Sequence, residues 1–139
     1  MQAEIFAIGT ELFMGELTDA NSAWLAARLS ALGIALRRVS LLGHHLTTLS
    51  DAMAQALQGV DLMITTGGLG PAQDDLTREA MAVALHETPT VHAETLQAIA
   101  RSLQQRGRDM PAPIASKPTA FRPRSSCPIP MAALRAGGS

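Results

Sequence analysis

The chain has 139 residues, 47% of them hydrophobic and 17% charged, and one cysteine; these values are typical of a globular domain and exclude a collagen-like, disordered or disulfide-stapled chain. The net charge of −1 combines two unlike parts: residues 1–110 carry seven arginines and twelve acidic residues (−5), and residues 111–139 carry four basic residues and no acid (+4). The acidity of residues 1–110 argues against binding of nucleic acid or of an anionic membrane through a broad positive face.

Three short apolar runs predict strands, at 3–8, 34–42 and 60–66. Each run is followed directly by a glycine, which is typical of a strand that enters a turn. The middle of the run at 60–66 is apolar on both faces, and this pattern favours a strand in the centre of a sheet.

Helices are predicted at 20–32, from Thr47 or Ser50 to 59, at 75–86 and at 94–106. Thr18 or Asp19 can cap the first helix, because a side-chain oxygen at that position accepts a hydrogen bond from the first turn. Trp24 and the methionines on helices are interpreted as core residues, and 89–91 as a short connection.

Alternating strands and helices with short connections predict parallel strands joined by right-handed crossovers, and hence a layered α/β domain. In such sheets, ligands bind beyond the carboxyl ends of the strands. Three polar turns, at 9–11, 43–45 and 65–77, are predicted to meet at that edge.

The turn at 65–77 is the most informative part of the sequence. Gly67, Gly68 and Gly70 let backbone amides approach a ligand, and the start of the following helix favours an anion such as phosphate. Neither a P-loop nor the dinucleotide fingerprint is present. An ordinary strand-to-helix turn capped by Asp74 or Asp75 is an equally weighted alternative on spacing alone. Two adjacent carboxylates beside an anion site favour a bridging divalent cation such as Mg²⁺.

Thr66-Gly67-Gly68-Leu69-Gly70 followed by Asp75-Leu76-Thr77 resembles the TGGxGxxxxDxT signature of the MoaB/Mog molybdopterin-binding domain. With the segments 9–17 (and Asn21) and 106–111, the chain resembles the N-terminal domain of the CinA competence/damage-inducible family. The resemblance implies a three-layer α/β/α Rossmann-like fold with a nucleotide or pterin-nucleotide pocket at the strand ends, self-association, and either metal-dependent ADP-ribose pyrophosphatase activity or binding without catalysis.

The resemblance also assigns roles by position. Asp75 would coordinate a divalent metal or position the reacting group; Asp74, the second of the two adjacent carboxylates, is predicted as a catalytic residue from its position next to Asp75 and not from the signature. The residues that would bind phosphate or nucleotide are Thr10, Glu11, Asn21, Thr66, Gly67, Gly68, Gly70 and Thr77. Glu11 as a solvated loop acid, and Asn21 as a helix residue with local hydrogen bonds only, are the alternatives.

His44 departs from the family, which usually has an aspartate after the preceding glycine. The side chain replaces a carboxylate with a group that is mostly neutral at pH 7, which would weaken metal binding or catalysis at that point. A His pair can indicate a metal site, but without two further ligands nearby His44 and His45 are interpreted as exposed loop residues.

Residues 111–139 hold six of the eight prolines and Cys127, so neither a helix nor a central strand is expected there. Regrouping the codons of 112–118 and 130–137 by one base permits Asn/Asp-Arg-Lys-Gln-Ala and Gly-x-Ala-Pro-Gly, which the family carries after Met110-Pro111. We therefore predict a domain over 1–110, incomplete at its C-terminus, and a disordered Pro/Arg-rich tail over 111–139 that a frameshift would produce. A natural Pro-rich tail is the alternative, and an inactive truncated product is the third functional possibility.

No signal peptide and no bilayer-spanning apolar run is recognisable in the sequence, and the expected location is the cytoplasm.

Overall fold

The computed structural model describes residues 1–70, 72–88, 90–91, 93–109 and 119–120. Its strands are β1 (Gln2–Ile8), β2 (Ala35–Leu42), β3 (Leu62–Thr66), β4 (Thr90–Val91) and β5 (Thr119–Ala120). Its helices are α1 (Thr10–Phe13), α2 (Ala20–Ala31), α3 (Leu46–Gly59), α4 (Thr77–Leu85) and α5 (Ala93–Gln105). No helix in these ranges is long and apolar enough to cross a membrane.

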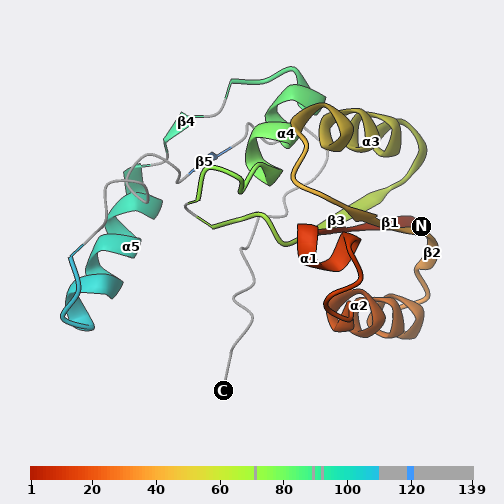
Figure 1. The fold of residues 1–139 in the computed structure, drawn as a ribbon, viewed down its shortest axis with the longest axis horizontal. Coiled ribbons are helices and arrows are strands. Elements are labelled where there is room, and N and C mark those ends of the chain that lie inside the picture. Colours follow the sequence, from red (N-terminus) through yellow and green to blue (C-terminus); the bar gives the residue numbers. More distant parts are fainter. Residues whose placement is uncertain (71, 89, 92, 110–118, 121–139) are drawn as a thin grey trace.

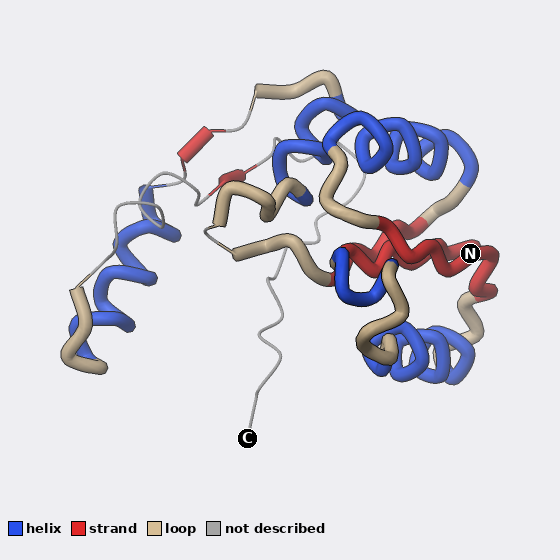
Figure 2. The backbone as a smooth tube through the Cα atoms, viewed as in Figure 1, coloured by secondary structure: helices blue, strands red, loops and turns tan. Residues whose placement is uncertain are grey.

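A parallel sheet with the strand order β2-β1-β3 forms the middle layer. Helix α2 lies on one side of it, and α3 and α4 lie on the other (Figure 1). Figure 2 shows the three strands as one red layer between blue helices, with α5 set to the side of the sheet. The predicted three-layer α/β/α fold is confirmed.

Strand β1 lies at the centre of two apolar clusters, because its alternate side chains point to opposite faces. Phe6 and Ile8 pack with Leu49 and Met53 of α3 and with alanines of α4. On the opposite face, Ala3, Ile5 and Leu29 form a smaller cluster. All residues from Ala3 to Ile8 are buried, as the apolar run predicts.

The buried Glu4 is the polar exception in β1. Its Oε2 accepts hydrogen bonds from Nε and Nη2 of Arg38 at 3.2 and 2.9 Å, and Nε of Arg37 lies 3.7 Å from Oε1. Both arginines belong to β2, so a buried charge and its partners join the two strands.

Three predictions about the packing are wrong. Trp24 is 57% exposed, with the Arg28 guanidinium 5.2 Å above its ring, and α2 instead buries Ser22 and Leu29. Strand β3 lies at the edge of the described sheet, and each of its residues is partly exposed. Thr90–Val91, expected to be a connection, pairs antiparallel with Thr119–Ala120 in the segment expected to lack structure.

The helix caps differ in part from the prediction. Asp19 caps α2, because its carboxylate accepts the amide hydrogen of Ser22 at 3.0 Å. Helix α3 begins at Leu46 with His45 as its N-cap, so neither Thr47 nor Ser50 starts it. Helix α4 begins at Thr77, with Leu76 as its N-cap and no side-chain cap. Neither Asp74 nor Asp75 therefore caps this helix, which was the alternative to a catalytic role.

The rest of the predicted tail, 111–118 and 121–139 with Cys127, lies outside the described residues.

Candidate functional site at the carboxyl edge of the sheet

The three predicted turns meet at one edge of the sheet, because β1, β2 and β3 are parallel and end at Ile8, Leu42 and Thr66. The amide of Gly9 donates a hydrogen bond to the carbonyl of Leu42 at 2.9 Å. Nδ2 of Asn21 donates to Oγ1 of Thr66 at 3.3 Å. The turn after β1 therefore contacts the end of β2, and α2 reaches the end of β3.

The glycine turn begins with two residues in the left-handed backbone region, Gly67 at φ +86° and Gly68 at φ +59°. A Cβ atom at Gly67 would run into the carbonyl of Ile8, and one at Gly68 would run into Oγ1 of Thr77. Both the lack of space for a Cβ atom and the left-handed backbone conformation thus require glycine at these two positions.

Thr77, the first residue of α4, holds the turn through two hydrogen bonds. Its hydroxyl donates to the carbonyl of Gly67 at 2.9 Å, and its amide donates to the carbonyl of Gly68 at 3.3 Å. The side chain is 2% exposed, so this predicted phosphate-binding residue holds the turn from inside.

Asp75 also contacts the turn. Its Oδ2 accepts the amide hydrogen of Ala72 at 3.0 Å, and a Cβ atom at Gly70 would lie 2.5 Å from the same oxygen. Asp74, the neighbouring predicted catalytic residue, is exposed. The predicted carboxylate pair therefore has one member built into the turn and one in solvent.

Sequence reasoning missed Arg78. Its Nη1 donates to the carbonyl of Leu69 at 2.6 Å and its Nη2 to the carbonyl of Gly70 at 2.7 Å. A guanidinium can hold two neighbouring carbonyls because its donors form a rigid fork. The signal in the sequence was an arginine in the first turn of a helix, where the helix dipole disfavours a cation.

A hollow of roughly 380 Å³ lies between α1 and the start of α3, at the carboxyl end of β2. Its walls are Thr10, Phe13, Leu42, Gly43, His44, His45 and Thr48. Thr10 is the predicted site residue in this wall, and Glu11 folds back over Gly9, where an added Cβ would lie 2.7 Å from its Oε1.

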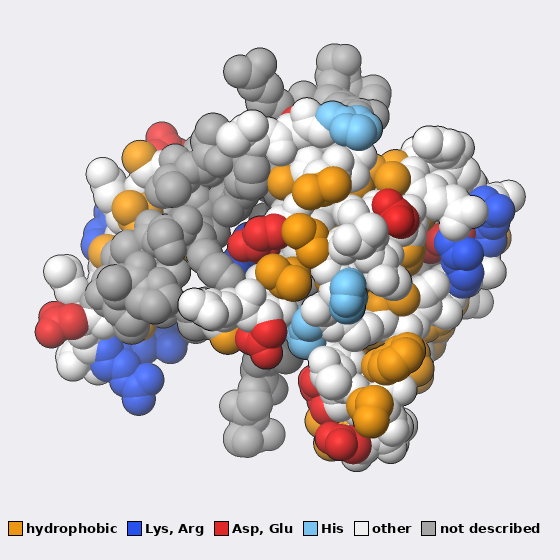
Figure 3. Space-filling model, turned by 45° about the horizontal axis from the view of Figure 1, so that its top comes forward, with side chains coloured by type: hydrophobic (Ala, Val, Ile, Leu, Met, Phe, Trp, Pro, Cys, Tyr) orange, Lys and Arg blue, Asp and Glu red, His pale blue; other side chains and the backbone are white. Residues whose placement is uncertain are grey.

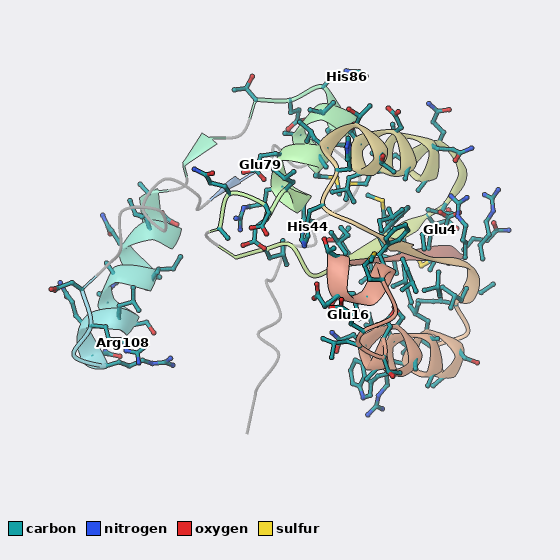
Figure 4. The ribbon with its side chains drawn as sticks, in the orientation of Figure 1. Glu4, Glu16, His44, Glu79, His86 and Arg108 are labelled. Carbon is teal, nitrogen blue, oxygen red and sulfur yellow. The ribbon has the colours of Figure 1, made fainter. Side chains whose placement is uncertain are left out.

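His44 is not the exposed loop residue that the sequence predicts. The side chain is partly buried, and a Cβ atom at Gly68 would lie 3.5 Å from its Cε1. Figure 4 shows His44 between the glycine turn and α1. The imidazole therefore separates the turn from the hollow.

The divalent metal implied by the resemblance stays a prediction. The described residues contain no group of three or more His, Cys, Asp and Glu side chains placed to hold an ion. Mg²⁺ in nucleotide sites is commonly held by one or two carboxylates together with substrate phosphates.

The face seen in Figure 3 carries histidine and acidic side chains among exposed apolar ones, while basic side chains gather toward two opposite edges.

Comparisons with known proteins identify the family of the chain. The family model described as "Probable molybdopterin binding domain" matches residues 4–134. A CinA-like protein from Deinococcus deserti is 48% identical over 109 residues, 78% of this chain and 27% of that protein. One from Thermomicrobium roseum is 44% identical over 111 residues. The chain thus spans about a quarter of the length of these relatives.

Solved structures show the same fold. CinA from Thermoplasma acidophilum has a TM-score of 0.75 and 25% identity, over 85% of this chain and 69% of that one. The molybdopterin biosynthesis Mog protein from Mycobacterium ulcerans has a TM-score of 0.58 and 25% identity, over 84% and 72%. The chain belongs to the MoaB/Mog-like family of probable molybdopterin binding domains, and over most of its length it is similar to about a quarter of the length of the CinA-like proteins of that family.

Proposed function

We propose that this domain binds a phosphorylated nucleotide or pterin nucleotide at the glycine turn. The observation that carries the proposal is the way in which Thr77 and Arg78 hold the carbonyls of the turn. Their hydrogen bonds engage the carbonyls of Gly67, Leu69 and Gly70. Carbonyls that accept hydrogen bonds inside the protein do not turn their oxygens toward an anion, and we propose that the backbone amides of the turn meet it instead.

The hollow that His44 lines, next to the turn on the other side of the imidazole, supports a ligand larger than a phosphate ion. Its volume of roughly 380 Å³ is within the range of small-molecule sites. Phe13 offers an aromatic surface, and Thr10 and Thr48 offer hydroxyl groups. An aromatic ring with a sugar and a phosphate would use both kinds of wall.

Hydrolysis of the pyrophosphate link in ADP-ribose is the second candidate. The observation that favours it is the carboxylate of Asp75 at the turn, with Asp74 beside it in the chain. Asp75 would orient the ligand's phosphates through the loop that it holds, and the amides would stabilise charge that develops on them. The divalent cation expected for this activity would bring Lewis-acid chemistry when bound.

Calorimetric titration with ADP-ribose, AMP and adenosine tests the binding proposal. We expect the two phosphorylated compounds to bind and adenosine to bind at least tenfold more weakly. An equal affinity for adenosine, or no binding of ADP-ribose, would overturn it.

Release of AMP from ADP-ribose, followed with and without Mg²⁺, tests the second candidate. Turnover that is lost in an Asp75→Asn variant and kept in an Asp51→Asn variant supports hydrolysis, since Asp51 is an exposed residue of α3. Binding without AMP release would leave a binding module.

A further inference from the structure

The imidazole of His44 has one buried nitrogen that lacks a partner. Nδ1 is covered, and it forms no hydrogen bond with any residue in the described part of the chain. Buried polar atoms are almost always paired, and an unpaired N–H group is rarer than an unpaired acceptor, so this burial bears on where the hydrogen of the ring sits. The rest of the side chain lines the hollow, between the turn after β1 and the start of α3.

The burial of Nδ1 decides which nitrogen carries the hydrogen in the neutral ring. One nitrogen of a neutral imidazole is a donor and the other is an acceptor. An N–H group buried without an acceptor is among the rarest arrangements in proteins. The favoured tautomer therefore leaves Nδ1 bare and places the hydrogen on Nε2.

The position of the ring decides what that donor can meet. A Cβ atom at Gly68 would lie 3.5 Å from Cε1 of His44, so the ring lies against the glycine turn. Nε2 is bonded to Cε1, so the donor lies one bond from the ring atom that faces the turn. A ligand phosphate held by the amides of the turn would stand within reach of a donor from the His44 side.

We infer that His44 is a specificity-determining residue that donates an Nε2–H hydrogen bond to a phosphoryl oxygen of the ligand. This inference rests on the proposed function, because the glycine turn must hold the phosphate that His44 contacts. A carboxylate in the same place would only accept hydrogen bonds, and would repel the phosphate unless a cation lay between them. With His44, the ligand is bound by donors on both sides and needs no bridging cation for affinity.

Two substitutions to amide side chains distinguish the contributions of the two ring nitrogens to ligand binding. The side-chain amide of glutamine reaches about as far as Nε2, and that of asparagine only about as far as Nδ1. We expect His44→Gln to bind ADP-ribose within about threefold of the unsubstituted protein, and His44→Asn to bind about tenfold or more weakly, since a hydrogen bond to a charged group is lost. His86→Asn is the matched control: His86 is exposed at the end of α4 with φ +55°, a conformation that asparagine tolerates (Figure 4).

Titrations are made in EDTA and again with Mg²⁺, on variants whose urea unfolding midpoints match that of the unsubstituted protein. Equal affinity of His44→Asn and the unsubstituted protein would overturn the role of His44, as would an equal loss in His44→Gln and His44→Asn. Binding by the unsubstituted protein only when Mg²⁺ is present would also overturn it. No binding of ADP-ribose under either condition would instead refute the proposed function itself.

Nitrogen NMR of the imidazole gives a readout that a purely structural role would not move. We expect Nδ1 of His44 to resonate as a bare nitrogen and Nε2 as a protonated one, with the Nε2 signal shifting when ADP-ribose is added. A proton on Nδ1, or an Nε2 signal unchanged at saturation, would contradict the inference.

Discussion

Gly67 is the residue at which the turn tolerates least change. Alanine there would need a left-handed backbone and would run into the carbonyl of Ile8, whereas at Gly15, with φ +76°, an added Cβ meets nothing within 4 Å. We expect Gly15→Ala to cost about 1 kcal/mol and Gly67→Ala to cost about 3 kcal/mol or more, as measured by urea unfolding. Equal losses in the two variants would show that the contact with Ile8 does not constrain the turn.

Arg78 is the residue that we expect to control the shape of the turn from outside. Lysine keeps the charge but cannot hold the carbonyls of Leu69 and Gly70 together. We expect Arg78→Lys to lower the free energy of unfolding by about 1 kcal/mol and to weaken ADP-ribose binding, whereas Arg108→Lys, at an exposed position after α5, changes neither. An unchanged affinity in Arg78→Lys would show that its two hydrogen bonds do not shape the site.

The positions of the site residues could be predicted from the sequence, but most of their contacts could not. Glycine at 67, 68 and 70 indicated the turn, and the motif placed Thr77 beside it. The hydrogen bond from Thr77 to Gly67 joins residues ten positions apart, and it depends on how the start of α4 packs against the end of the sheet. The burial of His44 depends on the packing of β1, β2 and the turn, which no local pattern contains.

At the scale of elements, the buried carboxylate of Glu4 connects β1 and β2. Glu4→Gln would put an NH₂ group in place of the oxygen that accepts from Arg38. This group is itself a donor, and it would face the two guanidinium donors Nε and Nη2. We expect a loss of about 2 kcal/mol, reduced from that of a fully buried pair because both arginines are about half exposed. Asp61→Asn removes only the charge of an exposed acceptor of the Gln2 amide hydrogen and should cost less than about 1 kcal/mol. Chemical denaturation of both variants checks the contrast, and a larger loss for Asp61→Asn would contradict it.

The elements that the sequence predicts well are those with a local pattern. β1 is an unbroken apolar run, and α3 repeats buried residues at helical spacing, so both were found. Helix α1 has four residues, which is too short for such a pattern. The edge position of β3 and the pairing of β4 with β5 depend on contacts between segments distant in the chain.

At the scale of the whole molecule, exposed apolar side chains occur at the end of α1 and directly after it. Phe13, Met14 and Leu17 are each about 60% exposed. Such exposed groups of large apolar side chains are typical of interaction surfaces, and we expect the protein to self-associate through this one. Light scattering should give a mass above the 14.6 kDa of one chain, falling toward it in a Met14→Glu, Leu17→Glu variant. A single-chain mass for the unsubstituted protein at 100 µM would contradict the expectation.

The central claim is that the glycine turn binds the phosphate of the ligand. Titration of the ¹⁵N-labelled protein with ADP-ribose, followed by amide NMR, tests it most directly. The account predicts saturable shifts that are largest at the amides of Gly67, Gly68 and Gly70, and small shifts with adenosine. Shifts confined to α5, or equal shifts with both compounds, would contradict it.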